Sequence, residues 1–382
     1  MLFRTPELDD TEGTVLGEID GLRESLRLYV HEPRRWVGSL SRAQFARAVR
    51  GSNTIEGIDV TEDDASAIQH GEEPLDADQE VTLAIKGYCE ALTFVLQLAA
   101  DKSFIYDSTL LKSLHFMMTS YSLDNRPGQW RAGSIFVHDE RTSEIVYEGP
   151  SLELIQPLIE EFVAALNQDS SDHSVIKAAM AHLNLVMIHP YRDGNGRMAR
   201  CLQTLILSRE GILAPVFSSV EEYLGRRTQD YYQVLAQVGG GRWHPEGDAR
   251  PWIRFMLLAH LRQGRTLLRR VKESEQVWRE LAKLSEFLRL PERAITPMWD
   301  ATMGYRVRRS TYVAALRDHG EELTEQTAGR DLKRLVDAGM LLPEGDKRGR
   351  RYRAGPDLKA VRQRIREERD PRDDSNPFAR DA

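Results

Sequence analysis

One stretch of the sequence is the most informative about the fold and the function: His189-Pro190-Tyr191-Arg192-Asp193-Gly194-Asn195-Gly196-Arg197-Met198-Ala199-Arg200. An apolar helical pattern runs up to Ile188, and Pro190 prevents its simple continuation because proline lacks the backbone N–H. Glycines at 194 and 196 free the backbone for a sharp turn. A second helix is predicted to begin near Gly196. The stretch therefore predicts a helix–loop–helix junction.

Such a junction is chemically useful because the N-terminus of a helix attracts anions. Backbone N–H groups from Gly194 to Arg197 would form a nest for phosphate. Arg197 and Arg200 are three residues apart and share a helix face beside it. Asp193 offers an oxygen ligand for Mg²⁺ already held by phosphates. His189, with an ordinary pKa near 6.5, could accept a hydroxyl proton at the rim.

Each of these residues has an ordinary explanation when it stands alone. A single histidine at a helix end is usually a cap, and Asp-Gly-Asn-Gly is usually a tight turn. Arginine pairs on helices are mostly solvated. Eight positions of restricted residue type within twelve residues favour the functional interpretation.

This string resembles the signature of the Fic (filamentation induced by cAMP) family, His-x-Phe-x-Asp/Glu-Gly-Asn-Gly-Arg-x-x-Arg. The match is complete except at Tyr191, where the family usually has Phe. That position anchors the loop in the core, so the tyrosine is expected to be tolerated if its hydroxyl finds a partner. Similarity to the family extends from about Ser39 to Leu261, over half the chain.

The resemblance implies transfer of AMP from ATP to a Ser, Thr or Tyr hydroxyl of a protein. His189 would deprotonate the hydroxyl, and Asp193 would bind Mg²⁺ that bridges the α- and β-phosphates. Gly194, Asn195 and Gly196 would hold phosphate oxygens, while Arg197 and Arg200 would neutralise the β- and γ-phosphates. Positioning and charge neutralisation supply most of the catalysis in such chemistry.

A second motif, Ser52-Asn53-Thr54-Ile55-Glu56-Gly57, precedes the core. Taken alone it is a polar helix end with Gly57 as its C-cap. Beside the signature it resembles the family's inhibitory motif, Ser/Thr-x-x-x-Glu-Gly/Asn. The resemblance implies that Glu56, with Ser52 in the same motif, occupies Arg200 where the ATP γ-phosphate should bind.

Two further segments resemble parts of the same family. Ser134, Ile135, Phe136 and Val137 begin a short β-hairpin, predicted over 131–147, that resembles the family's flap and would dock an extended target by its strand edge. Tyr231 and Tyr232 would stack on the ATP base. Paired aromatic residues are, however, more often part of a core.

Composition excludes several classes of protein. The chain has 382 residues, 41% of them hydrophobic, which suits two or three globular domains. No run of about 18 apolar residues predicts a membrane span, and the N-terminus lacks the pattern of a secretory signal. Two cysteines cannot build a disulfide framework or a four-cysteine zinc site. We therefore expect a cytoplasmic protein without a membrane partner.

Charge divides the chain into unlike parts. The net charge is −7, yet residues 301–360 contain 13 Lys and Arg against 9 Asp and Glu. There, helical patterns over 309–319 and 324–338 are followed by two short segments flanking the turn at 343–346. This order resembles a winged helix. Thr327, Arg330, Lys333 and Arg334 would face a DNA groove, although the excess charge lies in the wing at 343–353 and favours phosphate contact over base reading.

The predicted fold class is mainly α: a Fic-type helical domain with a short β-hairpin flap, plus a C-terminal winged helix-turn-helix domain. The predicted parts are a helical region at 1–85 with the inhibitory motif at 52–57, a catalytic core at 86–262 with the signature loop at 189–200, a connecting helix at 263–290, a winged helix at 291–356 and a charged tail at 357–382. From about Val361 onward the tail is expected to be frayed or disordered.

Other functions remain open at this stage. The same site could remove AMP or transfer another phosphate-containing group, and the chain could instead be a DNA-binding regulator whose Fic domain senses nucleotide. The C-terminal module could equally dock a protein or form a homodimer. The expected partners are ATP, Mg²⁺, a protein presenting a hydroxyl, the chain itself as a target, and DNA.

Overall fold

The computed structural model describes residues 1–30, 35–75, 77–138, 144–209, 211, 217, 219–318, 320–345, 350–369 and 371–379. The predicted turn of the flap at 139–143 lies outside these residues. So do Asp346, the last residue of the predicted wing turn at 343–346, and the last residues of the tail.

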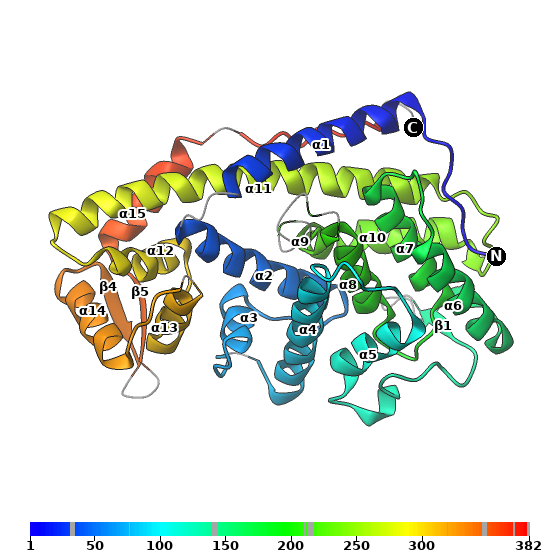
Figure 1. The fold of residues 1–382 in the computed structure, drawn as a ribbon, viewed down its shortest axis with the longest axis horizontal. Coiled ribbons are helices and arrows are strands. Elements are labelled where there is room, and N and C mark those ends of the chain that lie inside the picture. The colour runs from blue at the N-terminus through cyan, green and yellow to red at the C-terminus, as the bar shows by residue number, and fades with distance from the viewer. Residues whose placement is uncertain are drawn as a thin grey trace.

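The described chain is mainly α-helical, as predicted, and carries short strands (Figure 1). Before the signature loop the helices are α1 (Asp10–Val30), α2 (Arg35–Ile55), α3 (Glu62–Gln69), α4 (Gln79–Leu98), α5 (Ser108–Thr119), α6 (Leu152–Asn167) and α7 (Ser174–Ile188). After it come α8 (Asn195–Ser208), α9 (Glu221–Arg226), α10 (Thr228–Gly239), α11 (Arg250–Phe287), α12 (Ile295–Met303), α13 (Arg309–Arg317), α14 (Glu325–Asp337) and α15 (Pro356–Glu367). The strands are β1 (Phe136–His138), β2 (Ile145–Glu148), β3 (Gly241–Arg242), β4 (Leu341–Glu344) and β5 (Arg351–Ala354).

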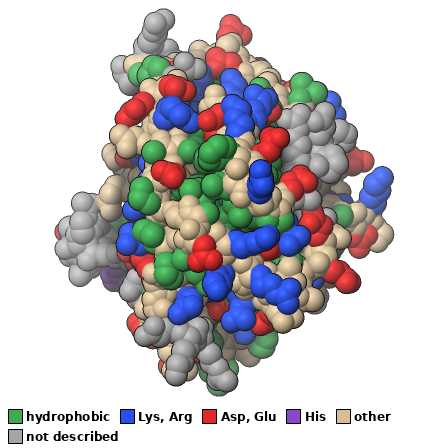
Figure 2. All heavy atoms as spheres, turned by 90° about the vertical axis from the view of Figure 1, so that its left-hand side faces the viewer, with side chains coloured by type: hydrophobic (Ala, Val, Ile, Leu, Met, Phe, Trp, Pro, Cys, Tyr) green, Lys and Arg blue, Asp and Glu red, His purple; other side chains and the backbone are tan. Residues whose placement is uncertain are grey.

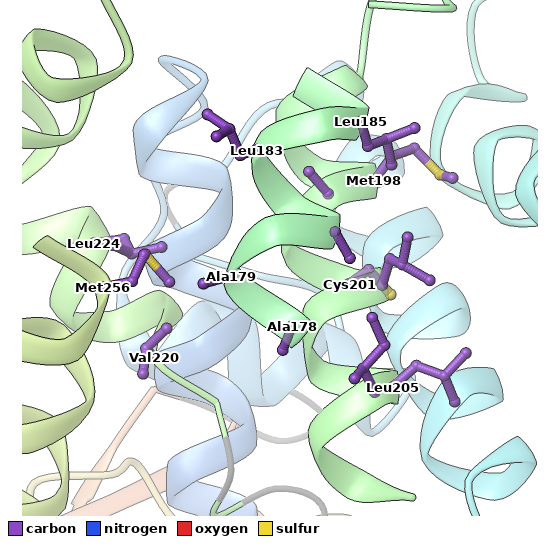
Figure 3. Close-up of a cluster of buried hydrophobic side chains, with 14 of the residues drawn as sticks. Ala178, Ala179, Leu183, Leu185, Met198, Cys201, Leu205, Val220, Leu224 and Met256 are labelled. Carbon is purple, nitrogen blue, oxygen red and sulfur yellow. The ribbon is translucent and has the colours of Figure 1, made fainter. Parts of the chain in front are cut away.

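The main core forms where α7 and α8 pack against α4, α9 and α11 (Figure 3). Leu183 and Leu185 of α7 and Met198 and Leu205 of α8 are buried there, together with Met256 of α11. Both helices are buried on almost every side because each is surrounded by other elements. The signature loop that joins them is therefore held between two rigid supports.

Helix α4 has the length and the mean hydropathy, 1.3, of a membrane span. Its Ile85, Tyr88, Leu92 and Val95 lie in the main core, as expected of the central helix of a packed domain. The sequence analysis, which looked for an uninterrupted apolar run, had not singled it out. A core helix passes the same test of length and composition as a membrane helix.

The predicted flap hairpin is confirmed by the antiparallel pairing of β1 with β2. The structure adds β3, which pairs parallel to β2 and leaves β1 at one edge of the three-stranded sheet. At two residues, β3 is too short to leave a periodic signal in the sequence. Phe136 of β1 is 43% exposed, so the edge strand presents an apolar side chain outward.

Helix α11 is one continuous helix of 38 residues that joins the two halves of the molecule (Figure 1). The predicted connecting helix at 263–290 covers the C-terminal two thirds of α11, which ends at Phe287. Beyond it, α12 to α15 and the antiparallel pair β4–β5 enclose a second core around Trp299, Tyr312, Leu332 and Leu358. The order of α13, α14, β4 and β5 is the one predicted for this region.

The prediction of a disordered tail is wrong for its first part. Residues Pro356–Glu367 form α15, and Leu358, Val361 and Ile365 of this helix are buried. Their spacing places them on one face of a helix, which charge density along the segment concealed. After α15 the chain runs back along α11 toward α1 (Figure 1).

The C-terminal unit rests on the helices that flank the inhibitory motif. The Arg306 backbone N–H donates to Asp63 at 2.7 Å, and Arg42 pairs with Asp300 at 3.5 Å. On its outer face, Figure 2 shows hydrophobic side chains at the centre with basic and acidic groups interspersed around them. This face is not a uniformly basic surface, and DNA contact stays a prediction.

Candidate active site

The signature loop has the backbone conformation that its glycines and proline predict. Helix α7 ends at Ile188, and His189 adopts the left-handed region at φ 49°. Gly194 has φ 78° and stands immediately before α8, which begins at Asn195. A left-handed conformation is rare for a residue other than glycine, so the surrounding loop must hold His189 in place.

The N-terminus of α8 receives a carboxylate from the inhibitory motif. A Cβ added to Gly196 would collide with Oε1 of Glu56 and lie 2.9 Å from Nη1 of Arg200. Only glycine allows this approach. Glu56 thus lies where the partial positive charge of the helix end favours an anion.

Arg200 is fully buried and is bound mainly by the inhibitory motif. Its Nε donates to Ser52 Oγ at 2.8 Å, and its Nη2 donates to the Ser52 carbonyl at 2.9 Å and to Glu56 Oε1 at 2.6 Å. Burial opposes the charge of Arg200, but the nearby Glu56 carboxylate raises the pKa of the guanidinium above its ordinary value. The two residues that the sequence assigns to inhibition therefore meet on this one arginine.

Arg197 contrasts with Arg200 one turn further along α8. It is 1% exposed, and its Nη2 reaches Asp193 Oδ2 at 3.2 Å. Its Nε and Nη1 are buried and find no hydrogen-bond partner among the described residues. Two donors that have been removed from water without a partner are suited to an incoming anion.

Asp193 lies at the open side of the loop, with its side chain 44% exposed. Besides Arg197, its Oδ2 accepts a hydrogen bond from Asn125 at 3.2 Å. No group of three or more His, Cys, Asp or Glu that could hold a metal occurs among the described residues. One accessible carboxylate fits Mg²⁺, which keeps several waters and takes further oxygens from phosphates.

His189 has the protonation state that a base requires. Its Nδ1 lies 3.1 Å from the Val186 carbonyl, so Nδ1 carries the proton and Nε2 keeps a lone pair. Burial lowers the pKa of the imidazole below its ordinary value of 6.5. The ring is therefore neutral at pH 7 and can accept a proton at Nε2.

Comparison with known proteins agrees with this geometry. Residues 105–207, which include the signature loop and α8, match the Fic/DOC family. The chain carries a Fic/DOC domain. The match ends before α9, so it leaves the C-terminal unit unassigned.

The relatives of this Fic domain bear consistent names. The protein adenylyltransferase Fic of Nematostella vectensis is 27% identical over 259 residues, covering 66% of this chain and 55% of that protein. Its counterpart in Culex quinquefasciatus is 40% identical over 101 residues, covering 26% of this chain and 18% of that protein. The chain thus spans about half, or less, of the length of these relatives.

Solved structures show the same fold. A Fic family protein from Desulfovibrio desulfuricans has a TM-score of 0.58 at 20% identity, with 92% of this chain and 98% of that chain covered. Fic-1 of C. elegans has a TM-score of 0.54 at 21% identity, with 69% and 73% covered.

Arg131 links the flap to the signature loop of the Fic domain. Its Nε donates to the His189 carbonyl at 3.0 Å, and its Nη2 donates to the Pro150 carbonyl. Its backbone N–H donates to the Pro190 carbonyl at 2.8 Å. The sequence places Arg131 in the predicted flap but indicates no role for it, because no local pattern shows which carbonyls a buried arginine will reach.

His115 of α5 packs against the signature loop, and no pattern in the sequence indicated this role. Its ring stacks on Tyr191 with centroids 3.8 Å apart, and its Nε2 lies 3.0 Å from the Asp193 carbonyl. Gly128 donates its N–H to Nδ1 at 2.9 Å, and burial lowers the pKa of His115 to about 4. A neutral ring with a fixed tautomer therefore clamps the loop.

Tyr191 is buried as predicted, but the expected partner for its hydroxyl is absent among the described residues. The phenol ring fills the core position through its stack on His115. Burying this hydroxyl without a hydrogen-bond partner lowers the stability of the fold, and the Phe that the family usually has at this position would avoid that loss.

The structure bears on two predicted ATP contacts. The Asn195 side chain accepts a hydrogen bond from the Tyr191 N–H and donates one to the Tyr191 carbonyl, at 3.0 Å each, so this amide closes the loop, and its contact with phosphate stays a prediction. Tyr231 is 1% exposed, and its hydroxyl lies 2.9 Å from His182 Nε2. It is a core residue and offers no open ring face to the ATP base.

Tyr232 is 41% exposed, so stacking on the base stays a prediction. Its hydroxyl donates to the Ile55 carbonyl at 2.7 Å, directly before Glu56. The structure thus connects Tyr232 to the end of the inhibitory helix, a role that its position in the sequence did not indicate.

Proposed function

We propose that this chain is a protein adenylyltransferase that transfers AMP from ATP to a hydroxyl side chain of a protein and is inhibited by its own Glu56. The observation that carries the proposal is the position of Glu56. Its carboxylate lies at the N-terminus of α8 and against Arg200, so both the helix end and the guanidinium favour an anion there.

The residues divide the chemistry between them. Nε2 of His189 takes the proton of the target hydroxyl as its oxygen bonds to the α-phosphorus. The bond from that phosphorus to the bridging oxygen breaks, and pyrophosphate leaves. Arg197 and the N-terminus of α8 stabilise the phosphate charge during this step. Mg²⁺, held by Asp193 and phosphates, would supply further charge neutralisation.

The flap would position the target protein. β1 is an edge strand of the three-stranded sheet, and its outer side would pair with an extended segment of another protein. Arg131 fixes this strand relative to His189 through the His189 carbonyl. A hydroxyl on the docked segment would therefore be presented at a constant distance from Nε2 with little dependence on target sequence. The same arrangement supports modification of a second copy of the chain.

Inhibition follows from charge. With Glu56 in place, Nε and Nη2 of Arg200 are bonded to the inhibitory motif, and the carboxylate repels the terminal phosphate of ATP. Nucleotide can still enter, but not with its γ-phosphate on Arg200. The α-phosphorus is then held in a geometry unsuited to attack.

Mass spectrometry of protein targets tests the reaction. The Glu56→Gly variant is incubated with Mg-ATP and a cell lysate, and modified proteins are identified. A mass gain of one AMP supports the proposal, whereas a gain of one phosphate contradicts it. Wild-type chain incubated with a target already carrying AMP tests the reverse reaction, which would show as loss of AMP.

A further inference from the structure

A second basic region lies away from the Fic site, where α11 meets α9 and the segment after α15. The two helices and this segment surround a groove of about 670 Å³. Eight of its described lining residues are basic and four are acidic. This local excess of positive charge stands out in a chain whose net charge is −7.

Several charged residues of the groove are unpaired. Arg262, Arg269 and Lys272 of α11 and Arg372 after α15 form no ion pair with any described residue, and the lining acids Glu368 and Asp374 form none either. Other cations in the groove are paired: Arg369 lies 3.1 Å from Glu273, and Arg265 lies 2.7 Å from Asp373. The paired residues fix the walls, and the eight basic and four acidic residues of the described lining leave a net charge of +4 around one space.

The cations also repel one another. Burial lowers the pKa of Arg269, and the charges of Arg372 and Arg369 lower it further. Nε of Arg269 and Nε of Arg262 are buried without a hydrogen-bond partner among the described residues. An anion in the groove would relieve this repulsion and satisfy these donors.

We propose that the groove binds a small anion carrying two or more phosphate groups. Guanidinium groups match phosphate oxygens in geometry, and a net charge of +4 in the described lining calls for more than a single phosphate. The volume is in the range of small-molecule sites rather than of an extended polymer track. The site is separate from the Fic pocket, because its lining includes neither the signature loop nor the inhibitory motif.

The groove is placed to influence the inhibitory motif. Arg226 in its wall belongs to α9, and the backbone of Gly225 in α9 packs directly against Gly51 in α2. Gly51 immediately precedes Ser52. A ligand that repositions α9 would therefore act on the helix that delivers Glu56 to Arg200.

Binding of inorganic triphosphate tests the proposal on the full chain. Calorimetry compares wild type with the double variant Arg269→Gln, Arg372→Gln. The matched control, Arg279→Gln with Lys283→Gln, removes two charges from the exposed surface of the same helix, where these side chains are 68% and 74% exposed. We expect at least a tenfold loss of affinity in the groove variant and less than a twofold change in the control, with affinity falling as salt rises.

Tryptic cleavage after Arg369 and Arg372 locates the ligand independently. Triphosphate should slow cleavage there in wild type, and sulfate at equal ionic strength should not. Because the Fic pocket also attracts phosphates, binding that is equal in all variants, without protection at these two sites, would overturn the proposal. If the double variant melts at a lower temperature, Lys272→Gln, on an exposed side chain, gives the same comparison with less risk to folding.

Discussion

Arg200 and Arg197 lie three residues apart on α8, and their surroundings differ. Nε and Nη2 of Arg200 donate to Ser52 and Glu56, which leaves Nη1 without a described partner, whereas Arg197 reaches only Asp193 and keeps both Nε and Nη1 without one. On the Arg200 side the site is closed by the chain itself. On the Arg197 side, Asp193 is 44% exposed and the site is open. In the proposed function, inhibition would therefore act on the end of the phosphate chain that faces Arg200 and leave the end that faces Asp193 accessible.

The largest effect expected is the loss of His189, which belongs to neither side. His189→Ala should lower AMP transfer by about a hundredfold to ten-thousandfold, because no other group takes the hydroxyl proton. Rates of label transfer from α-labelled ATP measure this in the Glu56→Gly background. His173→Ala, at the opposite end of α7, is the matched control and should retain transfer. Equal losses in both variants would show that α7 is merely destabilised.

The two sides can be separated by nucleotide affinity. Glu56→Gly should tighten ATP binding by about tenfold or more, because a charge-assisted bond of about 1.5–3 kcal/mol no longer competes for Arg200. Affinity for AMP, which lacks the terminal phosphates, should stay unchanged. Calorimetry with both nucleotides measures the difference, with Asp59→Gly as the control for loss of an exposed acid in the same loop. An equal gain for AMP would contradict a contact confined to the terminal phosphates.

A buried acid, Glu221 of α9, lies near Arg200. Burial raises the pKa of Glu221 to about 7, and Tyr88 donates to its Oε1 at 2.6 Å. The folded chain keeps this proton between pH 4.5 and 7 while the unfolded chain loses it. The free energy of unfolding therefore falls as the pH rises through this range, by about 3 kcal/mol at about 1.4 kcal/mol per pKa unit.

Glu221→Gln should remove that loss, so the variant should be more stable than wild type at pH 8 and nearly equal to it at pH 5. Denaturant unfolding at both pH values measures it. Glu222 is the matched control with the opposite sign: burial opposes its charge, but Arg270 at 2.5 Å lowers its pKa to about 2. Glu222→Gln should be less stable than wild type at pH 8. Destabilisation of both variants at pH 8 would refute the assignment for Glu221.

The smallest effect is expected at Tyr191, which underlies both sides of the loop. Tyr191→Phe removes a buried hydroxyl without a described partner and should raise the free energy of unfolding by about 1 kcal/mol. Tyr147→Phe is the control, because the Tyr147 hydroxyl donates to the Met187 carbonyl at 2.7 Å and its loss should destabilise. Thermal melting of both variants decides the point. A lower melting temperature for Tyr191→Phe would mean that the hydroxyl is satisfied.

The sequence predicted what depends on local pattern. The junction around Pro190 and Gly194, the mainly helical fold and the flap hairpin followed from residue types and their spacing. So did the meeting of Glu56 with Arg200, through the family resemblance. The predicted flap turn at 139–143 and Asp346 of the predicted wing turn lie outside the described residues.

What the sequence did not predict depends on tertiary contacts. His115 and Arg131 act by reaching backbone carbonyls far along the chain, and no spacing indicates those partners. Asn195 and Tyr231 have the residue types of a ligand site, but their polar atoms are used inside the protein. Charge density in the tail masked the apolar face of α15.

The central claim is that the Glu56–Arg200 contact inhibits transfer. Label transfer from α-labelled ATP, measured side by side for wild type and Glu56→Gly, tests it most directly. The two proteins must first be shown to melt at the same temperature. We predict an increase in labelling of target protein and of the chain itself when Glu56 is removed. Unchanged labelling in Glu56→Gly would contradict the claim.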